Sequence, residues 1–377
     1  MSVTLSHQSA LDAIRVLRYE GMDMHEMTAV QLTSPSAWVG RRLGMRNFAP
    51  DVWRWNAPSA KRPLHILVPN AHSRVRGTGI LAHAANGSLP AGSILWLDEN
   101  SSVVCPELLF LQMADSFSLP ALVMLGMELC GHFSRQADDP LMGDVVDGVP
   151  AATSVERLKS HLAAFKGTKG LRKAREALRY VCDHAVSAPE AVLAVMFGLP
   201  PEEGGYGNGP LLLNERVQLG ESGSLGKAKN RYPDLMFGFA PVGLNYDGSK
   251  HFSVIDLMAA AEAFARSDAK GQDAARGVLR DKLLAARAKV IDDNLRNRQL
   301  AAEGRIVFSV TKEDLSNVSR LDELARQVLN CASKVFGADV EEHLETLDNG
   351  FLARERGELL EILTPHAAFG VSSYGKL

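Results

Sequence analysis

The stretch from residue 231 to residue 251, RYPDLMFGFAPVGLNYDGSKH, constrains the fold most, because it holds two short apolar runs bounded by acidic residues. A Pro-Asp pair ending at Asp234 opens the first run, and Asp247 closes the second. Apolar runs of this length, separated by turn residues, are typical of neighbouring β-strands. Two carboxylates on adjacent strands, with the imidazole of His251 just beyond, form an arrangement in which nucleases hold a divalent metal against a phosphate.

Length and composition indicate several folded units. A chain of 377 residues that is 46% hydrophobic and 23% charged is expected to form two or three compact domains. We predict five segments, which differ in composition and hydrophobic pattern. They are an N-terminal helical segment (1–62), a small α/β domain (63–150), a basic helical connector (151–184), a larger domain of helices and strands (185–335) and a C-terminal helix and tail (336–377).

The pattern of residues 185–335 predicts a helix, three strands, a long helical region and a fourth strand. The strands are expected at 211–219, 234–239 and 241–247, and directly after Gly304. This is the core order of the restriction-endonuclease-like fold, in which carboxylates from the helix and two strands converge on a metal. The expected fold class is therefore α/β, with a restriction-endonuclease-like core preceded by a smaller α/β unit and a basic helical segment.

Several motifs in residues 185–315 resemble, in the same order, those of the very-short-patch-repair-endonuclease-like domain of unknown function. AVSAPEAVLAVMFGLP contains Glu190, RYPDLMF contains Arg231 and Asp234, and LNYDGSKH contains Asp247. DDNLRNRQLAAEG and RIVFSVTKEDL match the closing helix and strand. The upstream region from LHILVP to ELCGHF is similar to AbiEi-like antitoxin or regulator regions.

The resemblance implies hydrolysis of a phosphodiester with Mg²⁺, which prefers carboxylate oxygens and activates a water molecule. Asp234 and Asp247 would hold the metal. Glu190 would orient a water molecule, and His251 would act as an acid or base or would polarise the phosphate.

One position departs from the family pattern. The family has a glutamate where this chain has Asn245, whose amide oxygen would be a neutral ligand. Asp247 lies two residues further along the same strand, so strand alternation places it on the same face as a substitute. Lys250 is displaced by one residue from the lysine of the nuclease motif.

Each of these residues also has a structural interpretation when it is taken singly. Asp234 follows a proline and is typical of a turn, and Asp247 with Gly248 is a common hairpin signal. Glu190 suits the first turn of any helix, and a lone histidine such as His251 is more often structural. The alternative function is a catalytically inactive DNA-binding regulator or antitoxin-like interaction protein.

A basic stretch between residues 157 and 179 is the main candidate for contact with nucleic acid. The net charge of the chain is only −3, so any phosphate-binding surface has to be local. A solvated helix face is the alternative explanation of such a charge run. The residues expected to contact nucleic acid are Lys169, Arg172, Lys173, Arg175, Arg231 and Lys250.

Other features limit the cofactor and the compartment. The four cysteines are far apart and form no CxxC pair, which indicates buried thiols in a reducing compartment. No signal pattern or membrane span is expected, so we predict a cytoplasmic protein whose partner is nucleic acid, with DNA favoured. A protein partner and the oligomeric state are left open. The spacing of His7, His65, His72 and His83 does not indicate a metal site.

Overall fold

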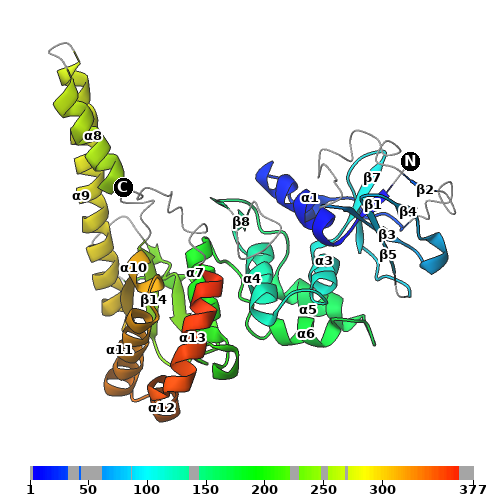
Figure 1. Ribbon diagram of the computed structural model, residues 1–377. Helices are drawn as coiled ribbons and strands as arrows, with labels where there is room; N and C mark the ends of the chain where they lie inside the picture. Colours follow the sequence, from blue (N-terminus) through cyan, green and yellow to red (C-terminus); the bar gives the residue numbers. More distant parts are fainter. Residues whose placement is uncertain are drawn as a thin grey trace. The chain divides into compact units, whose positions relative to one another are not determined.

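The computed structural model describes residues 3–32, 42–43, 62–85, 87–135, 144–220, 229–247, 254–267 and 271–364. The chain is mixed α/β and forms two compact units, unit 1 (Met1–Leu199 with Glu361–Leu377) and unit 2 (Pro200–Leu360). The elements of each unit can be followed by colour in Figure 1. Lys250 and His251 lie outside the described residues. None of the described helices is both long and apolar enough to cross a bilayer.

Unit 1 is built on a seven-stranded sheet with the order β2-β4-β5-β3-β1-β7-β6. β1 lies inside the sheet, antiparallel to β3 and parallel to β7, so the first residues of the chain are part of the α/β unit. The strands are β1 (Val3–Leu5), β2 (Arg42–Leu43), β3 (Leu64–Val68), β4 (Arg76–Gly77), β5 (Ile80–Ala84), β6 (Ile94–Trp96) and β7 (Ser101–Val104). A separate hairpin pairs β8 (Phe133–Arg135) with β9 (Val145–Asp147).

The helices of unit 1 follow sequence signals closely. One helix begins at Pro106, where the missing N–H of proline leaves no hydrogen bond unmade. Gly167 and Gly170 both adopt positive φ angles; Gly167 lies in the loop between the two basic helices, and Gly170 is the N-cap of the second one. The α-helices are α1 (His7–Tyr19), α3 (Pro106–Met113), α4 (Leu119–Cys130), α5 (Val155–Ala163), α6 (Leu171–Ala177) and α7 (Ala188–Gly198), with short 3₁₀ turns η1 (Met24–Glu26) and η4 (Ala71–Ser73).

Unit 2 contains a four-stranded sheet with the order β10-β13-β14-β15. The first three strands are antiparallel neighbours, and β15 is parallel to β14, which requires a crossover through α8 and α9. The sheet strands are β10 (Leu211–Leu213), β13 (Leu235–Phe237), β14 (Val242–Asp247) and β15 (Ile306–Thr311). A two-stranded ribbon pairs β11 (Val217–Gln218) with β12 (Asn230–Arg231).

The single strand predicted over 211–219 is wrong in one respect, because it is divided into β10 and β11. Asn214 lies between them with φ of 50°, a left-handed conformation that asparagine tolerates and that ends a strand. The strand predicted over 241–247 is confirmed as β14, and the strand after Gly304 as β15.

A long helical pair connects β14 to β15. Figure 1 shows α8 and the beginning of α9 as two packed helices that extend beyond the sheet of unit 2. α11 packs on β14 through a buried apolar face that includes Leu321, Val328 and Leu329. The helices here are α8 (Val254–Arg266), α9 (Gln272–Ala302), α10 (Lys312–Leu315), α11 (Val318–Phe336), α12 (Glu341–Asp348) and α13 (Gly350–Leu363), with a 3₁₀ turn η5 (Pro201–Glu203).

Candidate functional site

The residue before β13 and the end of β14 bring the predicted acidic residues of unit 2 together. Leu235 pairs with Leu244 in the antiparallel register, so Asp234 lies opposite Asn245. Residues directly opposite each other on neighbouring strands point to the same face, and Asp247 follows on that face two residues later. This register places the three side chains on one face of the sheet.

Asp234 and Asn245 are fixed by reciprocal hydrogen bonds. The Asp234 backbone N–H donates to Asn245 Oδ1 at 3.1 Å, and the Tyr246 N–H donates to Asp234 Oδ2 at 2.6 Å. Asn245 is 1% exposed, and its Nδ2 has no hydrogen-bond partner among the described residues. Burial, with the charges of Glu313 and Asp247, raises the pKa of Tyr246 to about 12, so its phenol stays protonated at neutral pH.

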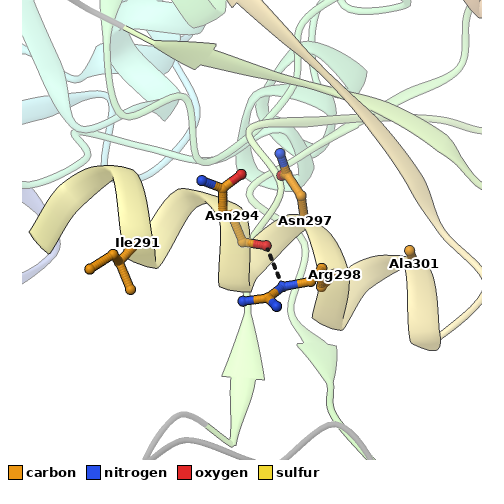
Figure 2. Close-up of a pocket in the computed structure, with 5 residues that line it drawn as sticks. All are labelled: Ile291, Asn294, Asn297, Arg298 and Ala301. Carbon is orange, nitrogen blue, oxygen red and sulfur yellow. Dashed lines mark hydrogen bonds between the residues drawn. The ribbon is translucent and has the colours of Figure 1, made fainter. Parts of the chain in front are cut away.

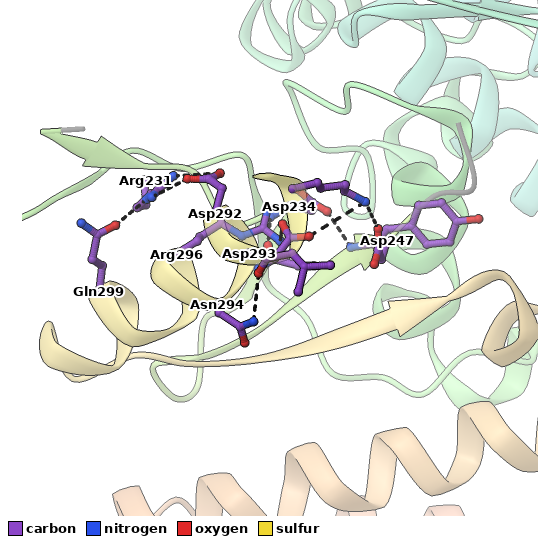
Figure 3. Close-up of polar contacts among 12 residues, drawn as sticks. Arg231, Asp234, Asp247, Asp292, Asp293, Asn294, Arg296 and Gln299 are labelled. Atoms are coloured by element: carbon purple, nitrogen blue, oxygen red, sulfur yellow. Dashed lines mark hydrogen bonds and ion pairs between the residues drawn. The ribbon is translucent and has the colours of Figure 1, made fainter. Parts of the chain in front are cut away.

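Helix α9 places a lysine against the end of β14. The Lys289 ammonium forms an ion pair with Asp247 and lies 3.9 Å from an oxygen of Asp293. Asp293 is also 3.2 Å from the guanidinium of Arg296. Figure 3 shows Asp234, Asp247 and Asp293 grouped where α9 passes the strand ends.

A second polar group interleaves with the first one along α9. Arg231 of β12 donates from Nε to Gln299 Oε1 at 2.8 Å and from a terminal nitrogen to Asp292 Oδ1 at 3.0 Å. Figure 3 shows this group beside the first one along the helix. We call the combined set the α9 seam; it consists of Arg231, Asp234, Asn245, Asp247, Lys289, Asp292, Asp293, Arg296 and Gln299.

The α9 seam has a slight excess of negative charge. It holds four carboxylates and three cations, so its formal charge is −1. A phosphate is repelled by such a surface unless a further cation enters it. The charge balance therefore allows a divalent cation and, with it, an anionic ligand.

The fit of Mg²⁺ to the seam is partial. The donor set suits it, because Mg²⁺ takes one or two carboxylates and completes its shell with water and phosphate oxygens. One oxygen of Asp234 already accepts a backbone N–H, and Asp247 is already paired with Lys289. No three carboxylate, histidine or cysteine ligand atoms cluster within 4.8 Å of one another in the described part of unit 2. A metal bound at Asp247 competes with the lysine for that carboxylate.

A groove on a neighbouring side of α9 adds polar groups of another kind. Figure 2 shows its lining, in which Arg298 Nε donates to the Asn294 carbonyl oxygen at 3.3 Å. Side-chain amides and guanidinium groups are donors and acceptors suited to base edges and phosphates. The groove is lined by Ile291, Asn294, Asn297, Arg298 and Ala301.

Glu190, the predicted helix glutamate, belongs to unit 1. Its two carboxylate oxygens accept hydrogen bonds from the Val186 N–H at 3.0 Å and from Ser187 Oγ at 2.8 Å. These contacts satisfy groups at the start of α7, as a capping glutamate does. Its predicted role toward a water molecule remains a prediction.

The predicted cations of the basic connector are largely engaged within unit 1. Lys169 pairs with Asp115 at 2.8 Å, and Lys173 donates to the Phe117 carbonyl oxygen at 2.6 Å. Arg175 donates to two carbonyl oxygens, those of Leu162 and Phe165. Arg172 is exposed and pairs with no residue in the part of the chain that the structure describes.

Sequence spacing missed a histidine cluster in unit 1. The expectation of no metal site among its histidines is corrected by the structure, which brings ligand nitrogens of His7, His65 and His83 within 4.8 Å of one another. Burial lowers the pKa of His7 to about 3 and that of His83 to about 4, and repulsion between the imidazoles adds to both shifts. The available signal was one histidine inside each of two apolar strands, LHILV and ILAHA.

Comparison of the chain with models of protein families, with curated proteins and with solved structures found no match.

Proposed function

We propose that unit 2 is an endonuclease-like domain that binds a nucleic-acid phosphate, with DNA favoured, together with Mg²⁺ at the α9 seam. The observation that carries this proposal is the placement of Asp234 and Asp247 on one face of neighbouring strands, in a set of residues whose formal charge is −1. The strand order supports it, since three antiparallel strands are followed by a helical crossover to a parallel fourth strand. That order agrees with the restriction-endonuclease-like core expected from the sequence.

Asp234 and Asp247 are the residues that would hold the metal. When bound, Mg²⁺ supplies positive charge to the phosphate and lowers the pKa of a water molecule. Asn245 would leave this site weaker than one with a glutamate, because its amide oxygen carries no charge and already accepts the Asp234 N–H.

Lys289 acts as the internal cation of the seam. Its ammonium neutralises Asp247, and its long stem allows the charge to move from the carboxylate to an incoming phosphate. The side chains of Asp247 and Lys289 are 47% and 22% exposed, so the pair is partly solvated. Ion pairs of this kind contribute about 0.2–1 kcal/mol, a cost that a divalent cation can overcome.

Lys289→Met tests this competition. Removing the ammonium should tighten Mg²⁺ binding by about 1.4- to 5-fold, the factor that corresponds to the lost ion pair. Isothermal titration calorimetry of the full chain measures it, with Lys334→Met as a control that removes an exposed lysine of α11 outside the seam. An unchanged Mg²⁺ affinity in Lys289→Met would show that the metal does not share Asp247 with the lysine.

A second candidate function is a catalytically inactive nucleic-acid-binding regulator or antitoxin-like module. The contacts that favour it are the neutral Asn245 locked against Asp234 and the lysine already seated on Asp247. In this case the ammonium stands permanently where a metal would bind. DNA binding that is independent of Mg²⁺, with no cleavage of plasmid or single-stranded DNA, would favour this second function.

A further inference from the structure

The sheet of unit 1 places two histidines on one face. β3 and β5 are parallel, with His65 opposite Leu81 and Leu67 opposite His83. Because side chains alternate along a strand, His65 and His83 share a face and lie diagonally to each other. Their imidazoles meet directly, with 3.0 Å between His65 Nδ1 and His83 Nε2.

A third histidine arrives from the start of α1. The His7 ring stacks on the His83 ring with 3.7 Å between centroids, and the His7 and His65 rings are 5.8 Å apart. One ligand nitrogen from each of the three lies within 4.8 Å of the other two. Three side chains from separate segments thus converge on one small volume.

The surrounding contacts hold these histidines in place. His7 has φ of 47°, in the left-handed region, and its backbone N–H donates to Gln112 Oε1 at 3.0 Å. Ser6 Oγ lies 3.2 Å from His7 Nδ1. The His65 backbone N–H donates to Ser9 Oγ at 2.9 Å. A hydrogen bond to the other nitrogen of an imidazole is the usual way in which a ligating histidine is oriented.

We propose that His7, His65 and His83 form a binding site for a divalent transition metal of the zinc class, with a fourth position left to water or an anion. Three imidazole nitrogens suit Zn²⁺, Co²⁺ or Ni²⁺, and do not suit Mg²⁺, which prefers oxygen ligands. Bonds of about 2.05 Å in a tetrahedral site place ligand nitrogens about 3.3 Å apart. The 3.0 Å between His65 and His83 is close to that separation, so side-chain rotations suffice to admit the ion.

The site differs from a closed structural zinc site. The group comprises three ligands, and each of the three side chains is only partly buried. Three protein ligands with an open position are typical of sites that bind or activate a small ligand. This site lies in unit 1 and is independent of the Mg²⁺ proposed for the α9 seam.

Zinc titration of the chelator-treated full chain tests the proposal. We expect one Zn²⁺ per chain, and a Co²⁺ absorption spectrum of a tetrahedral site without thiolate bands. His65→Ala and His83→Ala should weaken binding by more than the roughly 10- to 100-fold that follows loss of a hydrogen bond to a ligand. His72→Ala is the matched control, because His72 is an exposed histidine between β3 and β5 outside the cluster.

A measurement on the unmodified chain tests the proposal even if the variants misfold. Zn²⁺ should protect His7, His65 and His83 from carbethoxylation, mapped by mass spectrometry, and should leave His72 reactive. Three results would overturn the proposal: weak zinc binding, zinc that protects none of the three histidines, or zinc binding that keeps the wild-type affinity after both substitutions.

Discussion

Asn245→Asp is the substitution that separates a metal-binding seam from a purely structural one. It exchanges an amide for a carboxylate of almost the same shape. Oδ1 can still accept the Asp234 N–H, which is 3.1 Å away in the wild type. The only large change is one negative charge at a position that is 1% exposed.

Two opposite effects follow from that charge. Without metal, a second carboxylate is buried beside that of Asp234, and we expect the free energy of unfolding to fall by about 3–5 kcal/mol. With Mg²⁺, the new charge attracts a divalent ion about 4 Å away by about 2 kcal/mol even at the dielectric constant of water, equivalent to about 30-fold tighter binding. The variant should therefore be less stable than the wild type in chelator and should recover stability in Mg²⁺.

Three experiments measure these effects. Calorimetry with Mg²⁺ and Mn²⁺ gives the metal affinity, urea unfolding with and without metal gives the stability, and assays with plasmid and single-stranded DNA give the cleavage activity. Asn349→Asp is the control, because it adds the same charge at an exposed position outside the seam and the groove, and its Oδ1 can still accept the Phe351 N–H. Equal metal affinity for Asn245→Asp and wild type, with no rescue of stability by Mg²⁺, would refute the reasoning and leave Asn245 a structural residue.

Three further changes test other parts of the structure. Arg356→Met removes a guanidinium that is 0% exposed and 2.8 Å from Asp322. It should lower the unfolding free energy of unit 2 by about 3–5 kcal/mol in urea titrations, and a loss under about 1 kcal/mol would contradict the buried pairing. Burial raises the pKa of the Glu128 carboxyl, but the charge and hydrogen bond of Arg15 lower it more strongly, so that the pKa lies below its ordinary value of 4.5. The ionised Glu128 therefore stabilises unit 1 above pH 4.5, and this contribution is lost as the pH falls through the lower pKa of the folded state. The variant Glu128→Gln should be less stable than the wild type at pH 7 and should lack this loss of stability in acid, measured by unfolding titrations. A pH profile of stability identical to that of the wild type would contradict this expectation. Arg172→Ala should reduce the slope of log DNA affinity against log salt by about 0.9 if its side chain contacts one phosphate, whereas an unchanged slope in fluorescence anisotropy would indicate a solvated residue.

Local patterns in the sequence predict the strands of unit 2 well. The short apolar run before Asp247 indicates β14, and the position of Pro106 indicates the start of α3. These signals succeed because they depend on the neighbours of each residue along the chain. The break at Asn214 is harder to predict, since it depends on one backbone conformation that many asparagines do not adopt.

The partners of the site residues depend on long-range packing. Lys289 meets Asp247 across 42 residues, and the pairing requires the crossover helix to pass the end of β14 at one particular turn. His7 and His83 meet through the order of strands in a sheet, which their spacing does not reveal. The sequence therefore indicated which residues could carry chemistry, whereas the fold determined which of them lie together.

One measurement tests most directly whether the α9 seam is a site for phosphate and Mg²⁺. It is the affinity of the full chain for a labelled mixed-sequence DNA duplex, measured by anisotropy with Mg²⁺ and with chelator at the same ionic strength. We expect binding to strengthen with Mg²⁺ and this gain to disappear in Asp234→Asn and Asp247→Asn. Equal affinity in Mg²⁺ and in chelator, with both variants unchanged, would contradict it.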